Sequence, residues 1–290
     1  MLNQKKREIF LAKFHKSLVK QFLEIAIEYR NNVMVQLIDT HSHLYDEAFD
    51  EDIDIVINNA LENGVNKIIL PAIDSDTLEK QKKISASYPD IFYRMIGVHP
   101  TSIKENYRNE LDVVYNEIST NTDSYVAIGE IGLDYYWDTT FAKEQQIALI
   151  TQIEWANEYQ KPVALHVRNA YADVFEMLEK YPVDRRGVLH CFSGTLSDAE
   201  HAVDMGYMLG IGGVVTFKKN DLAKIVAEIP MQNILLETDA PYLAPTPYRG
   251  KRNQSAYILN IAQTVAEIKN ISLAQVAEQT SKNAIDIFGL

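Results

Sequence analysis

The stretch QLIDTHSHLYDEAF, residues 36–49, places two histidines directly after a short apolar run and an aspartate. Residues i and i+2 of a β-strand point to the same side, so His41 and His43 aim at one point if the strand continues through them. The stretch therefore predicts a buried strand whose end delivers two imidazoles to a single site.

Seven more short runs of β-branched and apolar residues follow, separated by segments with helical periodicity. Eight β–α units in strict alternation predict a parallel sheet, and the count favours an α/β fold of one domain, the (β/α)8 or TIM barrel. An open doubly wound sheet is the alternative, although no GxGxxG motif follows the first strand. The predicted strands cover residues 35–41, 67–72, 91–99, 125–132, 162–167, 187–192, 207–213 and 234–239, and the predicted helices cover 52–63, 76–87, 105–120, 141–159, 170–180, 196–205, 220–228, 255–269 and 273–288.

The composition is that of a globular protein, with 290 residues, 47% hydrophobic and 23% charged, and a formal net charge of -12. This acidity argues against a protein that coats duplex DNA, but it is compatible with an enzyme that grips a few nucleotides. No apolar run approaches the roughly 18 residues of a membrane span, so no membrane partner is expected. The single cysteine, Cys191, excludes an internal disulfide and fits a reducing compartment, so we expect a cytoplasmic protein.

The first 33 residues differ from the rest of the chain. They hold seven Lys or Arg against three Glu, and their apolar residues recur at helical spacing. We therefore divide the chain into a basic amphipathic extension, residues 1–33, with an additional N-terminal helix, and a barrel domain, residues 34–290. A terminal helix packed on the domain, or a native start at Met34, are both compatible with this segment.

Imidazoles and carboxylates recur at the carboxyl ends of five predicted strands, which form one face of a barrel. Four imidazoles and two carboxylates are ligands for divalent metals such as zinc or manganese, and they exceed what one four-coordinate ion needs. Two ions roughly 3.5–4 Å apart would use all six. The first ion is assigned to His41, His43, Glu130 and Asp239, and the second to Glu130, His166 and His190, with Glu130 bridging the two.

Each of these residues also has an ordinary structural reading. A histidine at a strand end is often only hydrogen-bonded, Glu130 could cap a helix, and Asp239 before Ala-Pro could start a turn. These structural explanations would have to apply independently on five strands, always at the carboxyl end. The coincidence favours the metal site.

Further residues are candidates on the same rim. His99 and Arg168 could steady a phosphate, although a loop exit and a rim salt bridge explain them equally well. Tyr135 and Tyr136 could stack a base, but paired loop aromatics are more often packing. Cys191 follows His190 directly, so on a strand it would point to the opposite side, and we expect a small core residue.

The segments DTHSHL, GVHP, GEIGLDYYWD, LHVRNA, LHCFSG, LLETDAPYLAP and PYRGKRN occur in an order and spacing that resembles the TatD-like metal-dependent deoxyribonucleases. The resemblance runs from about Gln36 to the C-terminus. It implies a TIM barrel similar to the amidohydrolases, one or two divalent ions including magnesium, and 3′ to 5′ exonuclease activity on DNA. The metal ligands that it implies are the six residues assigned above, whereas Tyr45 stands where the family usually has Asp or Asn.

The expected reaction is phosphodiester hydrolysis by a water activated between two metal ions (Mg, Mn or Zn), with Asp239 accepting its proton. We expect a monomer that acts on DNA at 3′ ends or on short single strands. Basic residues after the seventh and eighth strands would grip the nucleic acid, or be ordinary solvated charge: Lys218, Lys219, Arg249, Lys251 and Arg252. The main rival is an amidohydrolase, lactonase or deaminase on the same barrel. A non-enzymatic metal-binding scaffold is a second rival.

Overall fold

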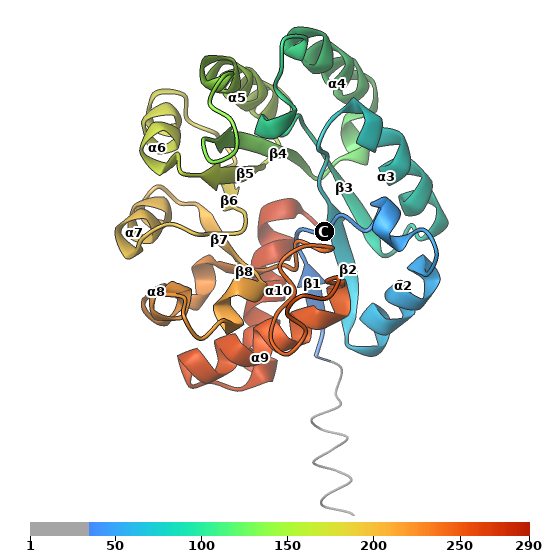
Figure 1. Ribbon diagram of the computed structural model, residues 1–290, viewed down its shortest axis with the longest axis vertical. Helices are drawn as coiled ribbons and strands as arrows, with labels where there is room; N and C mark the ends of the chain where they lie inside the picture. Colours follow the sequence, from blue (N-terminus) through green and yellow to red (C-terminus); the bar gives the residue numbers. More distant parts are fainter. Residues whose placement is uncertain (1–34) are drawn as a thin grey trace, which may run out of the picture. The chain divides into compact units, whose positions relative to one another are not determined.

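Eight parallel strands follow one another around a barrel in the order in which the chain meets them (Figure 1). The structure, a computed structural model, describes residues 35–290. The predicted TIM barrel is therefore confirmed, whereas the predicted N-terminal helix and the division at Met34 concern residues outside the described part. The strands are β1 (Leu37–Asp39), β2 (Val65–Leu70), β3 (Phe92–Ile96), β4 (Ala127–Asp134), β5 (Val163–Arg168), β6 (Gly187–Leu189), β7 (Met208–Ile211) and β8 (Ile234–Leu236).

Helices connect the strands and surround the barrel (Figure 1). The nine helices predicted within residues 35–290 are all present, and their observed ends differ from the predicted ones by three residues or fewer. Among residues 35–290, no helix has the length and apolar character needed to cross a bilayer. The helices are α2 (Ile53–Glu62), α3 (Ser75–Ser87), α4 (Tyr107–Asn121), α5 (Ala142–Glu158), α6 (Tyr171–Lys180), α7 (Leu196–Asp204), α8 (Leu222–Glu228), α9 (Ile258–Lys269) and α10 (Leu273–Phe288).

Backbone hydrogen bonds join the carboxyl ends of β8 and β1. The amide of Thr40 donates to the carbonyl of Leu236 over 3.1 Å, and its hydroxyl donates to the same oxygen over 3.0 Å. One step further, the amide of Asp239 donates to the carbonyl of His41 over 2.9 Å. These bonds close the barrel and place the residues that follow β1 beside those that follow β8.

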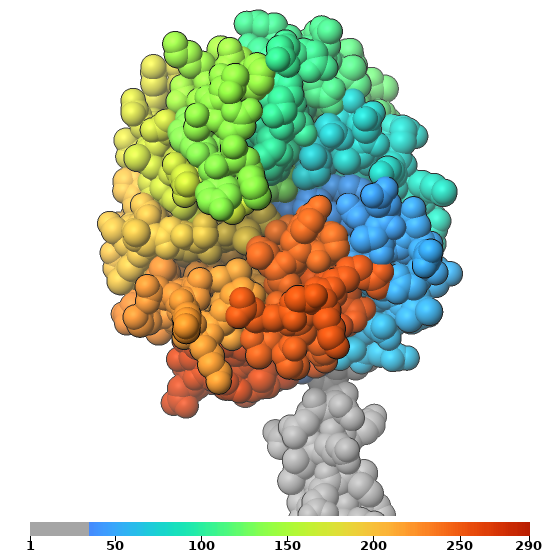
Figure 2. Space-filling view, viewed as in Figure 1, coloured from blue at the N-terminus to red at the C-terminus, as the bar shows by residue number. Residues whose placement is uncertain are grey.

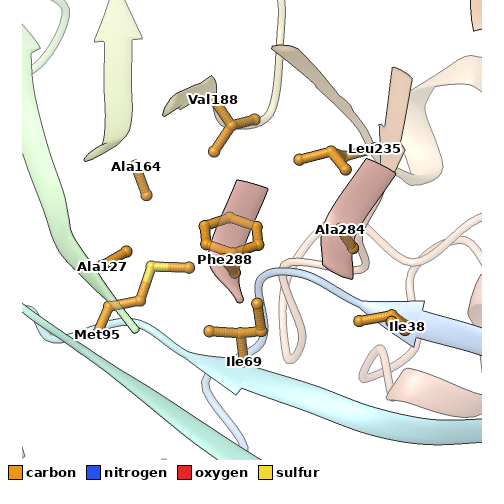
Figure 3. Close-up of a cluster of buried hydrophobic side chains, with 9 residues drawn as sticks. All are labelled: Ile38, Ile69, Met95, Ala127, Ala164, Val188, Leu235, Ala284 and Phe288. Atoms are coloured by element: carbon orange, nitrogen blue, oxygen red, sulfur yellow. The ribbon is translucent and has the colours of Figure 1, made fainter. Parts of the chain in front are cut away.

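Apolar side chains fill the opposite, amino-terminal end of the barrel (Figure 3). Helix α10 contributes Ala284 and Phe288, and the ring of Phe288 lies in the middle of the cluster. Burying a phenylalanine of this kind contributes about 1.5–3 kcal/mol. The strands contribute Ile38, Ile69, Met95, Ala127, Ala164, Val188 and Leu235. Apolar packing is thus concentrated at this end of the barrel, and the polar residues of the site lie at the carboxyl ends of the strands.

Candidate metal centre

The predicted imidazoles gather around the carboxylate of Glu130, which lies in β4 and is 2% exposed. Its two oxygens face different rings. Oε2 lies 3.0 Å from Nε2 of His41, whereas Oε1 lies 2.9 Å from Nδ1 of His166. The remaining contacts are Oε2 to Nε2 of His43 at 3.9 Å, and Oε1 to Nε2 of His99 and of His190 at 3.3 Å each. One carboxylate therefore faces a group of imidazoles with each oxygen.

Asp239 lies on the same side of Glu130 as His43. Its Oδ1 lies 3.3 Å from Nε2 of His43 and 3.9 Å from Nε2 of His41. The structure thus brings together all six residues predicted as metal ligands, and His99 with them. The contacts also divide them in two, with His43 and Asp239 on one side of Glu130 and His166 on the other.

A bulge in β4 helps to aim Glu130 at the centre. The register of β4 against β5 shifts between Ile128 and Ile131, so β4 holds one extra residue there. Bulges bend a strand and redirect its side chains. Gly132 follows with φ +146, and a Cβ at this position would lie 1.9 Å from the carbonyl oxygen of His166. Only glycine permits this close approach of β4 and β5.

A buried carboxylate, Asp39, fixes the turn that carries the first two histidines. It accepts hydrogen bonds from the amide and hydroxyl of Thr238, at 2.9 and 2.6 Å, and from the amide of His41 at 3.4 Å. Burial raises its pKa to about 7, although these hydrogen bonds oppose the shift. Asp39 therefore ties the end of β1 to the end of β8, directly beneath His41 and Asp239.

Two buried glutamines of α5 hold the ends of β3 and β4. Gln152 accepts from the amide of Val98 at 2.7 Å and donates to its carbonyl at 3.2 Å. Gln145 makes the same pair of bonds with the backbone of Asp134, at 3.0 and 3.3 Å. A side-chain amide that satisfies both groups of one residue fixes that part of the backbone. This pairing positions His99, which follows Val98.

Two carboxylates that the sequence analysis missed lie behind the imidazoles. Asp134 Oδ2 lies 2.9 Å from Nε2 of His166, and Glu237 Oε1 lies 3.0 Å from Nδ1 of His190. Carboxylates behind metal-binding histidines orient the ring and raise its basicity. The spacing could have identified them, because Asp134 follows Glu130 by four positions and Glu237 precedes Asp239 by two, which places each pair on one face of a strand as predicted from the sequence.

His43 is supported by a phenol instead of a carboxylate. Nδ1 of His43 lies 2.9 Å from the hydroxyl of Tyr45, and this hydroxyl donates to the carbonyl of Pro71 over 2.7 Å. The phenol donates its only proton to the carbonyl of Pro71. Its oxygen therefore accepts a hydrogen bond from His43, whose Nδ1 carries the ring proton. Burial raises the pKa of Tyr45 well above its usual value, which keeps the phenol neutral. The Nε2 lone pair of His43 is thereby directed at Asp239 and Glu130.

The charges of the centre depend on one another. Burial alone would raise the pKa of Glu130, but His190, His99 and His41 lower it well below its usual value. Burial alone would lower the pKa of His190, but Glu237 and Glu130 raise it well above its usual value. Burial lowers the pKa of His41 and of His99. The centre therefore holds ionised carboxylates among rings of which only some are protonated.

The expected geometry of the first two histidines is wrong in one respect. Strand β1 ends at Asp39, so His41 and His43 follow the strand instead of alternating along it. Their rings nevertheless lie 5.2 Å apart. The amide of His43 donates to the carbonyl of Ala240 over 2.7 Å. Hydrogen bonds to neighbouring strands, and not strand alternation, therefore direct the two rings to one point.

The expectation that Cys191 is a core residue is also wrong. Strand β6 ends at Leu189, and the backbone of Cys191 has φ 45, so its side chain does not follow strand alternation. Cys191 lines the cavity of the site, and its sulfur lies within 4.8 Å of ligand atoms of His190 and Asp239. Burial raises the pKa of this thiol, which favours its neutral form.

The predicted basic rim is only partly free. Arg252 makes two hydrogen bonds to Asp52, at 2.8 and 2.7 Å, and so is a paired residue. The guanidinium of Arg249 lies 4.1 Å from the ring centre of Phe217. Lys219 is exposed and lines the cavity. Of these residues, Lys219 has the placement expected of a nucleic-acid contact.

A cavity of about 1460 Å³ opens over the centre. Glu130, His166, Asp239, Arg168 and Trp137 are among the residues that line it. Figure 2 shows the light-green segment after β4 and the orange segment after β8 on one face of the molecule, on either side of a hollow. The centre is therefore accessible from this face.

The residues present fit divalent metal ions. Several groups of three residues place one ligand atom each within 4.8 Å of one another, among them His41, His43 and Glu130. Buried Nδ1 of His41 has no hydrogen-bond partner among residues 35–290. Imidazole nitrogens and carboxylate oxygens are the donors that zinc, manganese and related ions accept. A TIM barrel with such a cluster at its carboxyl-terminal end has the architecture of a metal-dependent hydrolase.

Comparison with known proteins identifies the family. The family of TatD related DNases matches residues 38–289, so the chain belongs to the TatD family. The uncharacterized metal-dependent hydrolase YabD of Bacillus subtilis is 36% identical over 254 residues, which cover 87% of this chain and 98% of YabD. The chain is accordingly a metal-dependent hydrolase of this family.

Solved structures agree with this assignment. The crystal structure of YjjV, a TatD homologue from Escherichia coli, superposes with a TM-score of 0.85 at 28% identity, covering 89% of this chain and all of YjjV (100%). A TatD family hydrolase from Entamoeba histolytica superposes with a TM-score of 0.79 at 26% identity, covering 87% of this chain and 98% of the other. The similarity therefore extends over the whole barrel.

Proposed function

We propose that this chain hydrolyses phosphodiester bonds of DNA, as an exonuclease that proceeds from 3′ to 5′ on free 3′ ends or short single strands. One observation carries the proposal. The carboxylate of Glu130 faces His41 with one oxygen and His166 with the other, at 3.0 and 2.9 Å. A carboxylate that faces potential metal ligands with each of its oxygens is suited to bridge the two ions of a two-metal phosphodiesterase.

In this proposal Glu130 and the imidazoles that face its two oxygens would hold two divalent ions (Mg, Mn or Zn). Such ions supply a bound water of lowered pKa and positive charge for the phosphate oxygens. His43 and Asp239 belong to one side together with His41, and His166 and His190 belong to the other. Asp134, Tyr45 and Glu237 hold the rings in place from behind.

His99 acts as a hydrogen-bond donor in this proposal. Its Nδ1 accepts from the amide of Thr101 over 3.1 Å, so the ring proton lies on Nε2. Nε2 is 3.3 Å from Oε1 of Glu130 and faces the centre. Burial lowers the pKa of His99, and the ring stays neutral. A neutral N–H at this position can bind a phosphate oxygen, and it competes with no metal ion.

Asp239 and Arg168 complete the proposed machinery. The carboxylate of Asp239 is 14% exposed and lines the cavity, so it can accept the proton of the attacking water. Arg168 lines the same cavity and carries a permanent positive charge, which can hold a phosphate oxygen of the bound strand.

The test uses purified protein loaded with each metal in turn and a single-stranded oligonucleotide labelled at its 5′ end. We expect a ladder of products shortened one nucleotide at a time, and no activity from Glu130→Ala. The circular dichroism spectrum of Glu130→Ala should match that of the unchanged protein. Cleavage at wild-type rate by this variant would refute the bridging role.

The rival small-molecule hydrolase is tested in the same experiment. Amidohydrolases and lactonases often use a carboxylated lysine as the metal bridge, whereas this chain has Glu130 at that position of β4. A panel of lactones, carboxylic esters and N-acyl substrates is assayed beside the oligonucleotide at equal enzyme concentration. A metal-dependent rate on one of these substrates, with no cleavage of DNA, would replace the proposed function by this rival.

A further inference from the structure

Two large aromatic rings stand exposed beside the metal centre, in the segment that follows β4. Tyr136 is 54% exposed and Trp137 is 70% exposed. Such exposure of a tryptophan leaves most of a large apolar ring in water, and Trp137 lines the cavity that contains Glu130. Tyr135, the other predicted stacking residue, is half-buried, and its hydroxyl donates to Asp173 over 3.0 Å. Stacking therefore falls to Tyr136 and Trp137.

A guanidinium lies against these rings. The central carbon of Arg168 is 3.8 Å from the ring centre of Tyr136 and 5.2 Å from that of Trp137. The two rings meet edge to face, with centres 4.9 Å apart and planes at 86°. Arg168 thus covers Tyr136, whereas Trp137 keeps an exposed ring surface next to a fixed positive charge.

One carboxylate links this pair of rings to the centre. Oδ1 of Asp134 accepts from the amide of Tyr136 over 2.9 Å and from that of Trp137 over 3.3 Å. Its Oδ2 contacts Nε2 of His166 at 2.9 Å. The backbone that carries the two rings is therefore fixed relative to the proposed metal ligand His166, so less conformational entropy is lost when a ligand binds them.

We propose that Trp137 stacks on one base of the bound DNA strand while Arg168 holds the adjacent phosphate. An aromatic surface beside a guanidinium, in the same cavity as a centre for phosphodiester hydrolysis, matches the base and phosphate of one nucleotide. Every base has an aromatic surface, so this contact tolerates any sequence. The inference rests on the proposed nuclease function and assigns the residue that holds the strand.

The composition of the chain makes this contact directly observable. The chain has two tryptophans, and the other, Trp155, is buried in α5 at 6% exposure. In Trp155→Phe, tryptophan fluorescence reports on Trp137 alone. The probe is a single-stranded hexanucleotide with phosphorothioate linkages, which resists cleavage, titrated into the metal-loaded protein. We expect quenching that saturates together with the fluorescence anisotropy of a labelled copy of the same probe.

Abasic probes then locate the stacked base. Each position of the hexanucleotide is replaced in turn by an abasic residue, and affinity is measured for the unchanged protein, for Trp137→Ala and for Trp137→Phe. One position should weaken binding to the unchanged protein by about 5- to 150-fold, the range of one stacked base. The abasic residue at this position should cause no further loss of affinity in Trp137→Ala, because both changes remove the same contact. Trp137→Phe should keep most of the affinity.

The outcomes separate the two proposals. A probe that binds by anisotropy, without quenching of Trp137 and with equal affinity for Trp137→Ala, would overturn the stacking role and leave the nuclease function standing. Additive losses from the abasic probe and Trp137→Ala would also overturn it. If no oligonucleotide binds or is cleaved by the metal-loaded protein, the proposed function and the stacking role are both refuted.

Discussion

Replacement of Tyr45 by phenylalanine is the most informative single change outside the cluster itself. Tyr45→Phe removes the oxygen that accepts from Nδ1 of His43 at 2.9 Å and keeps the ring. Without this acceptor the ring proton is no longer confined to Nδ1, and Nε2 loses its fixed orientation. Loss of the hydroxyl also leaves the carbonyl oxygen of Pro71 without its hydrogen-bond donor.

The magnitude follows from these two contacts. Loss of a partner behind a metal-binding histidine lowers metal affinity by about 10- to 100-fold, which corresponds to about 1.4–2.7 kcal/mol. The unpaired carbonyl of Pro71 costs about 1–3 kcal/mol of stability in addition. Tyr45→Asp, which introduces the residue type usual in the family, should recover metal affinity in part.

The assay is a competition titration of the metal-free protein with zinc and a coloured chelator, followed by urea unfolding of the same samples. Tyr207→Phe is the matched control, because the hydroxyl of buried Tyr207 has no hydrogen-bond partner within the described part of the chain. It lies just before β7, at the end of the barrel remote from the centre. Zinc affinity of Tyr45→Phe within twofold of the unchanged protein would refute the reasoning, as would an equal loss in Tyr207→Phe.

Two substitutions beside the centre and the pH dependence of zinc binding give three further tests. A Cβ on Gly210 would lie 2.2 Å from Oε2 of Glu237, so Gly210→Ala should displace Glu237 from His190 and lower zinc affinity about 10-fold, measured by the same titration. Gln152→Leu leaves the buried amide and carbonyl of Val98 unpaired. It should lower the free energy of unfolding, measured with urea, by about 2–4 kcal/mol. A loss under about 0.5 kcal/mol would contradict the hydrogen bonds described. Zinc must displace protons from His166 and His190, whose pKa values are raised, so zinc affinity should rise with pH. Calorimetry in two buffers should detect the released protons. A zinc affinity that stays the same from pH 6 to pH 8 would contradict this expectation.

The fold and the inner cluster could be predicted because each rests on repetition. Eight β–α units predict a parallel sheet from hydrophobic periodicity and favour the barrel over an open sheet, and parallel strands in a barrel present their carboxyl ends on one face. Any polar residue at such an end therefore approaches the others. This is why Glu130 and His166, 36 positions apart in the chain, could be predicted to meet.

The remainder depends on backbone geometry that periodicity does not encode. The positive φ of Cys191 turns its thiol toward the cavity, where strand alternation predicts the opposite side. The positions of Asp134 and Glu237 behind His166 and His190 depend on how each strand end packs beside the next, and only their spacing from Glu130 and Asp239 is visible in the sequence. The departure at Tyr45 was visible in the sequence, but its bond to His43 requires the path of the turn after β1.

Anomalous X-ray scattering from crystals of the zinc-loaded protein would show directly where metal ions bind. We expect two peaks in the cavity, one on each side of the Glu130 carboxylate, each about 2.0–2.1 Å from an imidazole nitrogen. One peak should be bound by His41, and the other by His166. A map without a peak in the cavity, or with zinc bound away from Glu130, would contradict it.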